Sequence, residues 1–390
     1  MTESRGRFLK NISFSATAVI GFFLALELLF RLPFFPPKWH LLEKTGRQGN
    51  AQIYKTPDGR QVLVPKPRRI FRIAVLGSSA AHGHPFFGAG FPEQMQAILE
   101  LTHPEQKYEV INLAQPGVST LIGKPMLEQA LVLKPDLILV YMGNNEQLTF
   151  SWVNSLEHPH IFEAGRFLVL NSRVIGAILL VQGQILARGA VPIMISKYFA
   201  AEGKGPRIWP LSRKVRARLV WLHNLEQMSK MAQKAGVPLV ISTMAANRSE
   251  WPPIRSVYSA RSTPQVRERC RKNREEIWEL IEQKDPGRAR EKADQTLKLD
   301  PEFALSWFYM GLIQKDMGLA QDAGNSFEKA VELSDFQQET SWADNRALLQ
   351  FCREKKLACV DLNSHLDRIS ASGFAGFNFF MDHCHFNLEG

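Results

Sequence analysis

The chain has 390 residues, of which 45% are hydrophobic and 22% charged, and its formal net charge is +10. This composition excludes a disordered chain, and the length suffices for one large domain or two ordinary ones. The positive charge favours anionic surroundings such as a membrane surface or an acidic polymer. The sequence contains no nucleic-acid-binding motif, so we expect no nucleic-acid partner.

Residues 12–30 form an apolar run whose one charged residue is Glu27. As a helix this run spans roughly 28 Å, close to the ~30 Å hydrocarbon core of a bilayer. It continues into Arg31 and more apolar residues instead of a small-residue cleavage site, which favours an uncleaved anchor. We therefore expect residues 1–32 to be a cytoplasmic tip and a single transmembrane helix. The rest of the chain would lie on the opposite side of the membrane, outside the cytoplasm.

Residues 33–68 are basic and rich in proline, which predicts a juxtamembrane linker with little core. Beyond them, short apolar runs alternate with helical patterns. The predicted strands are 70–76, 108–113, 137–142, 237–243 and 358–362, and the predicted helices are 92–101, 122–132, 213–235 and 339–354. Strands that are apolar throughout and alternate with helices predict a parallel sheet covered on both faces, in a three-layer α/β/α fold.

Residues 265–335 interrupt this alternation, because they are charged, helical in pattern and without a predicted strand. Small and aromatic residues recur there with a period of about 34 residues, which is typical of a tetratricopeptide repeat. The matching residues are Trp307, Gly311, Ala323, Phe327 and Ala330, and in a more degenerate earlier copy Ala289, Ala293 and Pro301. The alternative is a plain helical hairpin with aromatic residues in its core. We expect this insertion to pack on the host domain, which it divides into 69–264 and 336–390.

Three further patterns allow more than one interpretation. Two of the four cysteines could pair in an oxidising compartment, or all could be free thiols, and no metal-binding spacing is present. These are Cys270, Cys352, Cys359 and Cys384. The basic cluster within 204–218 is interpreted as a solvated helix face. The apolar stretch 168–181 could line an acyl pocket, but core is the preferred interpretation.

The first predicted strand ends in a Gly-Ser-Ser turn, from Gly77 to Ser79, and a helical pattern follows it. A serine at such a turn presents its hydroxyl at the edge of the sheet, where backbone amides can point at an oxyanion. Taken alone, a Gly-Ser turn after a strand is more often only a turn.

Asp382 and His385, near the end of the sequence, supply what a nucleophilic serine needs. A serine hydroxyl becomes reactive when a base takes its proton, and that base is best a histidine held by a carboxylate. A spacing of three residues lets the carboxylate reach one ring nitrogen while the other faces outward. The adjacent His383 and Cys384 raise the possibility of a metal site. However, neighbouring side chains point apart and the sequence has no second ligand cluster, so we expect no metal and no cofactor.

Gly117 follows the second predicted strand, and Asn145 follows the third. Gly117 can present a backbone N–H, and the side-chain amide of Asn145 can donate a hydrogen bond. With the backbone N–H of Ser79 they would offer three donors to one developing negative charge. The alternative for Asn145 is a turn residue that bonds its own backbone.

In content and order these blocks resemble those of the SGNH hydrolase superfamily, also called GDSL esterases. The blocks are Gly-Ser-Ser-Ala-Ala-His-Gly at 77–83, Gly117, Gly-Asn-Asn-Glu at 143–146 and Asp-His-Cys-His at 382–385. The resemblance covers roughly 69–250 and 336–390 and implies a flavodoxin-like sheet. The segment 247–253 and the sequence around Asn145 are similar to a bacterial subgroup that carries an N-terminal anchor and tetratricopeptide-like helices.

The resemblance implies a role for each site residue. Ser79 would be the nucleophile, His385 the base and Asp382 the residue that orients it. The oxyanion hole would comprise Ser79, Gly117 and Asn145. Two residues depart from the family pattern, since Ser78 and Glu146 stand where the family has aspartate. The sequence also stops at Gly390, where the family usually continues into a helix.

The function expected from these features is a serine esterase or O-acylhydrolase that forms an acyl-enzyme. Its substrate would be an ester-bearing small molecule, glycan or lipid. O-acyl transfer to a sugar hydroxyl is a close variant. The alternative from another class is a membrane-tethered interaction platform on an inactive hydrolase fold, with a protein partner bound by residues 265–335.

Overall fold

The computed structural model describes residues 17, 21–29, 41–86, 88–146, 207, 211–335 and 340–390. The apolar stretch 168–181 lies outside these ranges, as does much of the predicted anchor 12–30. Among the described residues, no helix combines the length and the apolar content needed to cross a bilayer. The chain divides into two compact units, and the elements below belong to the unit formed by 41–154 and 195–390.

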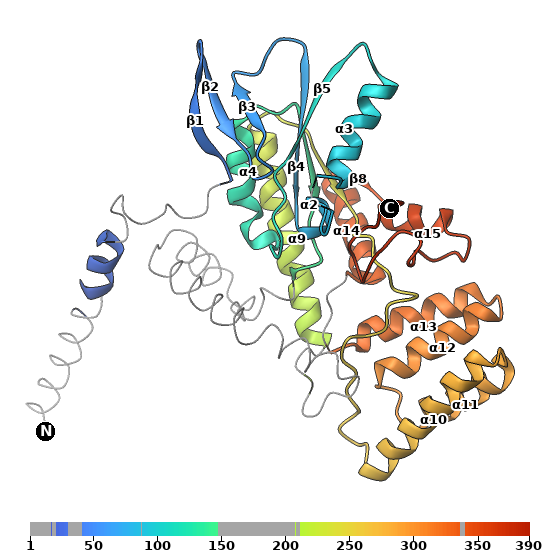
Figure 1. Cartoon of the computed structure of the whole chain (residues 1–390). Helices are drawn as coiled ribbons and strands as arrows, with labels where there is room; N and C mark the ends of the chain where they lie inside the picture. Colours follow the sequence, from blue (N-terminus) through green and yellow to red (C-terminus); the bar gives the residue numbers. More distant parts are fainter. Residues whose placement is uncertain are drawn as a thin grey trace, which may run out of the picture. The chain divides into compact units, whose positions relative to one another are not determined.

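A five-stranded sheet forms the centre of this unit, with the strand order β5-β4-β6-β7-β8 (Figure 1). Every neighbouring pair is parallel, which confirms the predicted parallel α/β sheet. The strands are β4 (Ile70–Gly77), β5 (Lys107–Asn112), β6 (Leu137–Tyr141), β7 (Leu239–Ser242) and β8 (Ala358–Val360). Because β4 lies between β5 and β6, the segments that follow these three strands meet at one edge of the sheet.

Helices cover both faces of the sheet. Ala74 and Leu76 of β4 belong to the largest core, to which α4, α9 and α14 contribute. The alternate residues Ile73 and Val75 pack on the opposite face with apolar residues of α3, as the two-residue period of a strand requires. The helices are α3 (Phe91–Thr102), α4 (Gly123–Val132), α9 (Leu211–Lys234) and α14 (Trp342–Lys355). Each overlaps a predicted helix.

Residues 43–64 form a second sheet, which corrects the prediction of a linker with little core. It is antiparallel, with strands β1 (Glu43–Gln48), β2 (Ala51–Lys55) and β3 (Gln61–Val64). Leu41 and Val62 are buried in the main core. Arg72 of β4 is fully buried and donates hydrogen bonds to the carbonyl of Leu63, at 3.0 Å, and to the carboxylate of Glu109, at 2.6 Å. The sequence did not predict these strands because their residues follow no clear alternation, and because β1 is exposed along its whole length.

Four helices form the insertion between β7 and β8, and each packs on the next (Figure 1). They are α10 (Pro264–Glu282), α11 (Pro286–Leu299), α12 (Ala304–Asp316) and α13 (Ala320–Leu333). Gly311 of α12 lies against the ring of Phe327, where a Cβ atom would collide. The indole of Trp307 donates a hydrogen bond to the carbonyl of Pro301, at 2.8 Å. These residues therefore fix helix contacts, and the tetratricopeptide assignment stays a prediction.

Two residues of the basic cluster within 204–218, Arg207 and Lys214, join the insertion to the sheet domain, so the interpretation as a solvated face is wrong for them. Lys214 is 5% exposed, and its ammonium donates to three carbonyls at the C-terminal end of α13. Arg207 bonds the carbonyl of Leu333 there, at 2.6 Å. Cations at a helix C-terminus satisfy its last carbonyls and offset its dipole.

One disulfide, between Cys352 and Cys359, links α14 to β8. Cys270 and Cys384 are buried and lie outside any disulfide. The sequence had left the choice of pair open.

Candidate active site

Ser79 is the first residue of α2 (Ser79–His82), the short helix that follows β4. Gly77 makes this turn possible, because a Cβ atom there would collide with the side chain of Ala81. As the first residue of a helix, Ser79 has a backbone N–H that needs no partner within the helix. The turn thus offers a hydroxyl and an N–H at the C-terminal end of the central strand.

Ser79, His385 and Asp382 form a hydrogen-bonded chain. The Nε2 atom of His385 lies 2.8 Å from the Oγ of Ser79. Its Nδ1 atom lies 2.6 Å from Oδ2 of Asp382. The structure therefore brings together the three residues that the sequence analysis selected as a triad.

The Asp-x-x-His spacing places the carboxylate beside the imidazole because Asp382 also fixes the backbone between the two residues. Its Oδ1 atom accepts hydrogen bonds from the backbone N–H groups of Cys384, at 2.9 Å, and His385, at 2.8 Å. Burial acts to raise the pKa of Asp382. The hydrogen bond to His385, the charge of His383 and the backbone N–H bonds outweigh it, so the pKa is lowered. Asp382 is thus ionised at neutral pH and fixed against its partner.

Two histidine rings flank His385. The ring centroids of His84 and His385 are 4.9 Å apart, and those of His383 and His385 are 5.6 Å apart. Burial lowers the pKa of His383 to about 4, although Asp382 acts to raise it. His383 is therefore neutral at pH 7. His383 contributes ring packing rather than a positive charge beside the base.

Asp382, His383 and Cys384 are the residues that could form a metal site near the triad. One potential ligand atom of each lies within 4.8 Å of the others, so the expectation that these neighbouring side chains point apart is wrong. Both oxygens of Asp382 already accept hydrogen bonds from His385 or the turn backbone. A metal ion would have to compete with those bonds, and the cluster is better described as part of the turn.

Gly117 and Asn145 lie on loops that meet at this edge. Gly117 has a φ of +72°, in the left-handed region that glycine adopts without strain. The side-chain amide of Asn145 donates to the carbonyl of Val118, at 3.0 Å. This bond ties the loop of Gly117 to the turn after β6. Whether Gly117, Asn145 and Ser79 share one oxyanion stays a prediction.

Glu146 binds the same loop, a contact that the sequence analysis missed. Its Oε1 atom accepts a hydrogen bond from the backbone N–H of Thr120, and its Oε2 atom accepts one from the Thr120 hydroxyl, both at 2.8 Å. The amide of Asn224 donates to the same hydroxyl, at 3.1 Å. Adjacent residues, Asn145 and Glu146, thus hold both ends of the stretch from Val118 to Thr120. The one signal in the sequence was the position of Glu146 beside Asn145.

Replacing Glu146 with glutamine should remove a pH dependence of stability. Burial raises the pKa of Glu146 from 4.5 to about 7, and its bonds to Thr120 offset this only partly. The folded chain then binds the proton more tightly than the unfolded chain does. The stability this adds is greatest below pH 4.5 and is lost as the pH rises towards 7, by roughly 3 kcal/mol in all. Urea denaturation between pH 5 and pH 8 would measure it. Glu105→Gln, on an exposed residue, is the control, and equal pH slopes in the wild type and Glu146→Gln would contradict the expectation.

No family model and no curated protein matches the chain. Solved structures with similarity include a GDSL-like lipase from Bacteroides thetaiotaomicron, at 9% identity and a TM-score of 0.32, over 82% of this chain and 81% of that one. TesA matches at 16% identity and a TM-score of 0.25, over 47% of this chain and 62% of TesA. Axe2, an acetylxylan esterase from Geobacillus stearothermophilus, matches at 12% identity and a TM-score of 0.26, over 47% of this chain and 64% of Axe2. The chain spans less than two thirds of TesA and Axe2, and at such TM-scores its function has to be argued from its own residues.

Proposed function

We propose that the chain is a serine hydrolase of the SGNH type that cleaves ester bonds. The observation that carries this proposal is the unbroken line of hydrogen bonds from Ser79 through His385 to Asp382. A serine hydroxyl, a histidine and a half-buried carboxylate in this order are the parts that acyl transfer requires, whatever fold presents them. In this proposal Ser79 is the nucleophile, His385 the general base and Asp382 the residue that fixes the imidazole.

The reaction has two halves. His385 takes the proton of Ser79 through Nε2 as Oγ attacks the ester carbonyl, and the resulting tetrahedral intermediate carries an oxyanion. When the intermediate collapses, the alcohol leaves with the proton held by His385, and an acyl-serine remains. Water then attacks the acyl-serine in the same way, which releases a carboxylic acid and restores Ser79. Asp382 stabilises the imidazolium that forms in both halves.

The backbone N–H groups of Ser79 and Gly117 and the side-chain amide of Asn145 would bind the oxyanion. The side-chain amide of Asn145 carries two N–H donors, and it donates one hydrogen bond to the carbonyl of Val118. Glu146 supports the arrangement by holding Thr120. Donors fixed before the reaction stabilise the oxyanion without reorganising at the moment of attack.

The setting of the enzyme is part of the proposal. We infer an inner-membrane anchor at 12–30, with the remainder of the chain outside the cytoplasm. The Cys352–Cys359 disulfide supports an oxidising compartment. Residues 21–29 are helical, and five large apolar side chains on them are exposed. These are Phe22, Phe23, Leu24, Leu28 and Leu29.

Labelling the purified full chain with a fluorophosphonate, followed by peptide mapping, tests the proposal. This reagent modifies activated serines and leaves serines in ordinary turns alone. We expect modification at Ser79 and not at the adjacent Ser78, and we expect it to disappear in His385→Ala. A folded chain that stays unlabelled would favour the alternative, an interaction platform on an inactive fold. O-acyl transfer shares the acyl-enzyme, so product analysis with and without a sugar acceptor would separate it from hydrolysis.

A further inference from the structure

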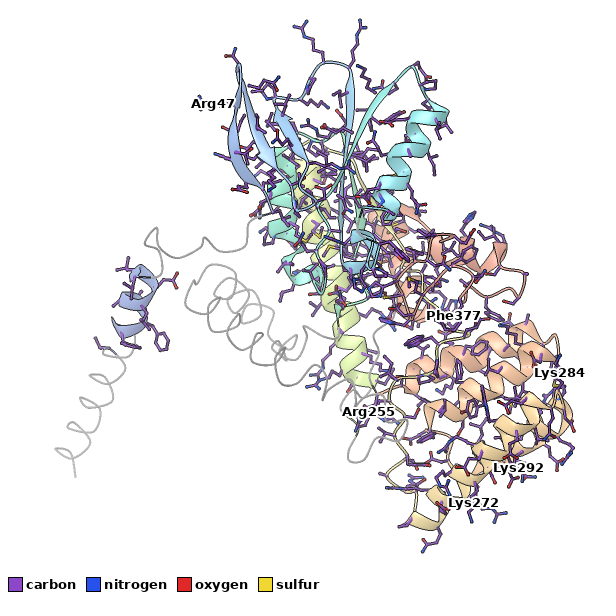
Figure 2. The ribbon with its side chains drawn as sticks, in the orientation of Figure 1. Arg47, Arg255, Lys272, Lys284, Lys292 and Phe377 are labelled. Atoms are coloured by element: carbon purple, nitrogen blue, oxygen red, sulfur yellow. A yellow bond between two sulfur atoms is a disulfide. The ribbon has the colours of Figure 1, made fainter. Side chains whose placement is uncertain are left out.

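A cavity of about 1030 Å³ lies between the helical insertion and the sheet domain. Helices α10 and α12 of the insertion form one wall. The segment from Glu250 to Ile254, after β7, and Phe377, in the segment that leads to the triad turn, form the other. Figure 2 shows Phe377 at this junction. The volume reaches the upper end of the range for small-ligand sites and exceeds what a short acyl group needs.

Aromatic rings on both walls face the cavity. Trp278 on α10 is 45% exposed, and Phe377 on the other wall is 48% exposed. Each has an aromatic neighbour, since the ring centroids of Trp278 and Tyr309 are 5.9 Å apart and those of Phe377 and Trp251 are 6.3 Å apart. Large rings left partly exposed on opposite walls offer flat apolar faces to a ligand between them.

The charged residues of the cavity largely balance one another. Arg271 pairs with Glu275, which also lines the cavity, and with Glu268. Glu250 accepts hydrogen bonds from Lys315, at 3.1 Å, and from the backbone N–H of Phe377, at 2.7 Å. The cavity therefore has no excess of cations to select an anionic ligand, and its lining adds some hydrogen-bonding groups to the aromatic rings.

Two packed rings separate the cavity wall from the triad. The ring centroid of Trp251, in the cavity wall, lies 6.1 Å from that of His383, and the ring centroid of His383 lies 5.6 Å from that of His385. The backbone N–H of Asn247, on the same segment as Trp251, bonds the carbonyl of His383, at 2.9 Å. A ligand that reaches Ser79 from the cavity has to be a chain that extends beyond these two rings.

We propose that this cavity binds a neutral carbohydrate chain whose ester substituent is the group attacked by Ser79. The proposal rests on the function proposed above and assigns it a substrate class. A sugar ring has an apolar C–H face that stacks on indole and phenyl rings, and an edge of hydroxyls that suits carboxylates and guanidinium groups. An alkyl chain would displace water from the exposed Arg271–Glu275 ion pair without replacing the hydrogen bonds to that water, which is costly. A strongly acidic polymer would be repelled by the carboxylates of the cavity, because the arginines there do not outnumber them.

Binding is tested first, in a Ser79→Ala background so that nothing is turned over. The purified full chain is screened against neutral oligosaccharides, acidic oligosaccharides, proline-rich peptides and fatty acids, with tryptophan fluorescence and calorimetry as readouts. We expect a neutral oligosaccharide to bind, and Trp278→Ala and Phe377→Ala each to weaken it about tenfold or more. Phe71→Ala is the matched control, because Phe71 is 38% exposed and lies at the start of β4, outside the cavity. It should leave the affinity unchanged.

Turnover then separates this inference from the proposed function. With Ser79 intact, Trp278→Ala should lower the ratio of turnover of an acetylated oligosaccharide to that of p-nitrophenyl acetate by about tenfold or more. A chain that hydrolyses neither ester but binds the oligosaccharide would refute the esterase and keep the cavity assignment. Binding of no neutral sugar, preferential binding of a peptide or fatty acid, or equal affinity in Trp278→Ala would overturn the cavity assignment alone.

Discussion

Replacing Ser79 with alanine is expected to lower kcat for an acyl ester by at least about 10⁴-fold. The Oγ atom forms the bond to the acyl group, and nothing else within the triad can replace it, since His385 and Asp382 act only through it. What remains should be the small acceleration that the oxyanion donors and substrate binding provide. Stopped-flow and steady-state assays of p-nitrophenyl acetate hydrolysis by the full chain would measure the loss and the missing acyl-enzyme burst.

Combining the Ser79 change with His385→Ala provides a sharper version of this test. Residues that act as one unit show strongly non-additive losses, so the double variant should be about as slow as Ser79→Ala alone. Ser364→Ala, on the exposed side of α15 (Leu362–Ile369), controls for loss of a serine hydroxyl elsewhere. If the effects of Ser79→Ala and His385→Ala multiply, the two residues do not work together and the proposed mechanism fails.

Asp382→Asn should cost roughly 10³–10⁴-fold in kcat while the chain stays folded. The amide oxygen can still accept the backbone N–H groups of Cys384 and His385, so the turn is kept. The amide nitrogen would face Nδ1 of His385 and donate to it. The histidine would then carry its proton on Nε2, where it faces Ser79 and cannot accept another.

Two measurements accompany the Asp382 change. The melting temperature should fall little in Asp382→Asn and more in Asp382→Ala, which loses both turn bonds. Fluorophosphonate labelling of Ser79 should slow in proportion to kcat. An Asp382→Asn enzyme as active as the wild type would show that His385 needs no carboxylate to hold its tautomer.

The sheet could be predicted because its strands are apolar over their whole length and are separated by helical periods. The strand order could not, because nothing in β4 itself says that β5 and β6 are its neighbours. β1–β3 were missed because their residues follow no clear alternation and their burial is confined to a few positions such as Val62. Lys214 was misjudged for a related reason, since the carbonyls that satisfy it belong to α13, 117 residues or more further along the chain.

The candidate site divides in the same way. Ser79, Asp382 and His385 could be selected because a strand-turn serine and an Asp-x-x-His pair are local patterns with a clear chemical purpose. The hydrogen bonds between Glu146 and Thr120 join two segments that meet only in the folded chain. The cavity lined by Trp278 and Phe377 is likewise formed by distant segments. The position of Glu146 beside Asn145 marks it as a residue of the site, but a single sequence does not say which distant residue it contacts. The pairing of Cys352 with Cys359 likewise could not be predicted from the sequence and follows only from the fold.

The hydrogen bond between Ser79 and His385 joins residues 306 positions apart, and the whole insertion is synthesised between them. During translation β4 and its serine leave the ribosome long before the base does. Domains form largely from the N-terminal side as they emerge, and contacts this distant in sequence are made late. The hydroxyl therefore remains an ordinary alcohol until the segment that carries His385 docks. On the proposed function, a nascent chain without that segment would be harmless to the esters around it, and reactivity of Ser79 would report that the segment has docked.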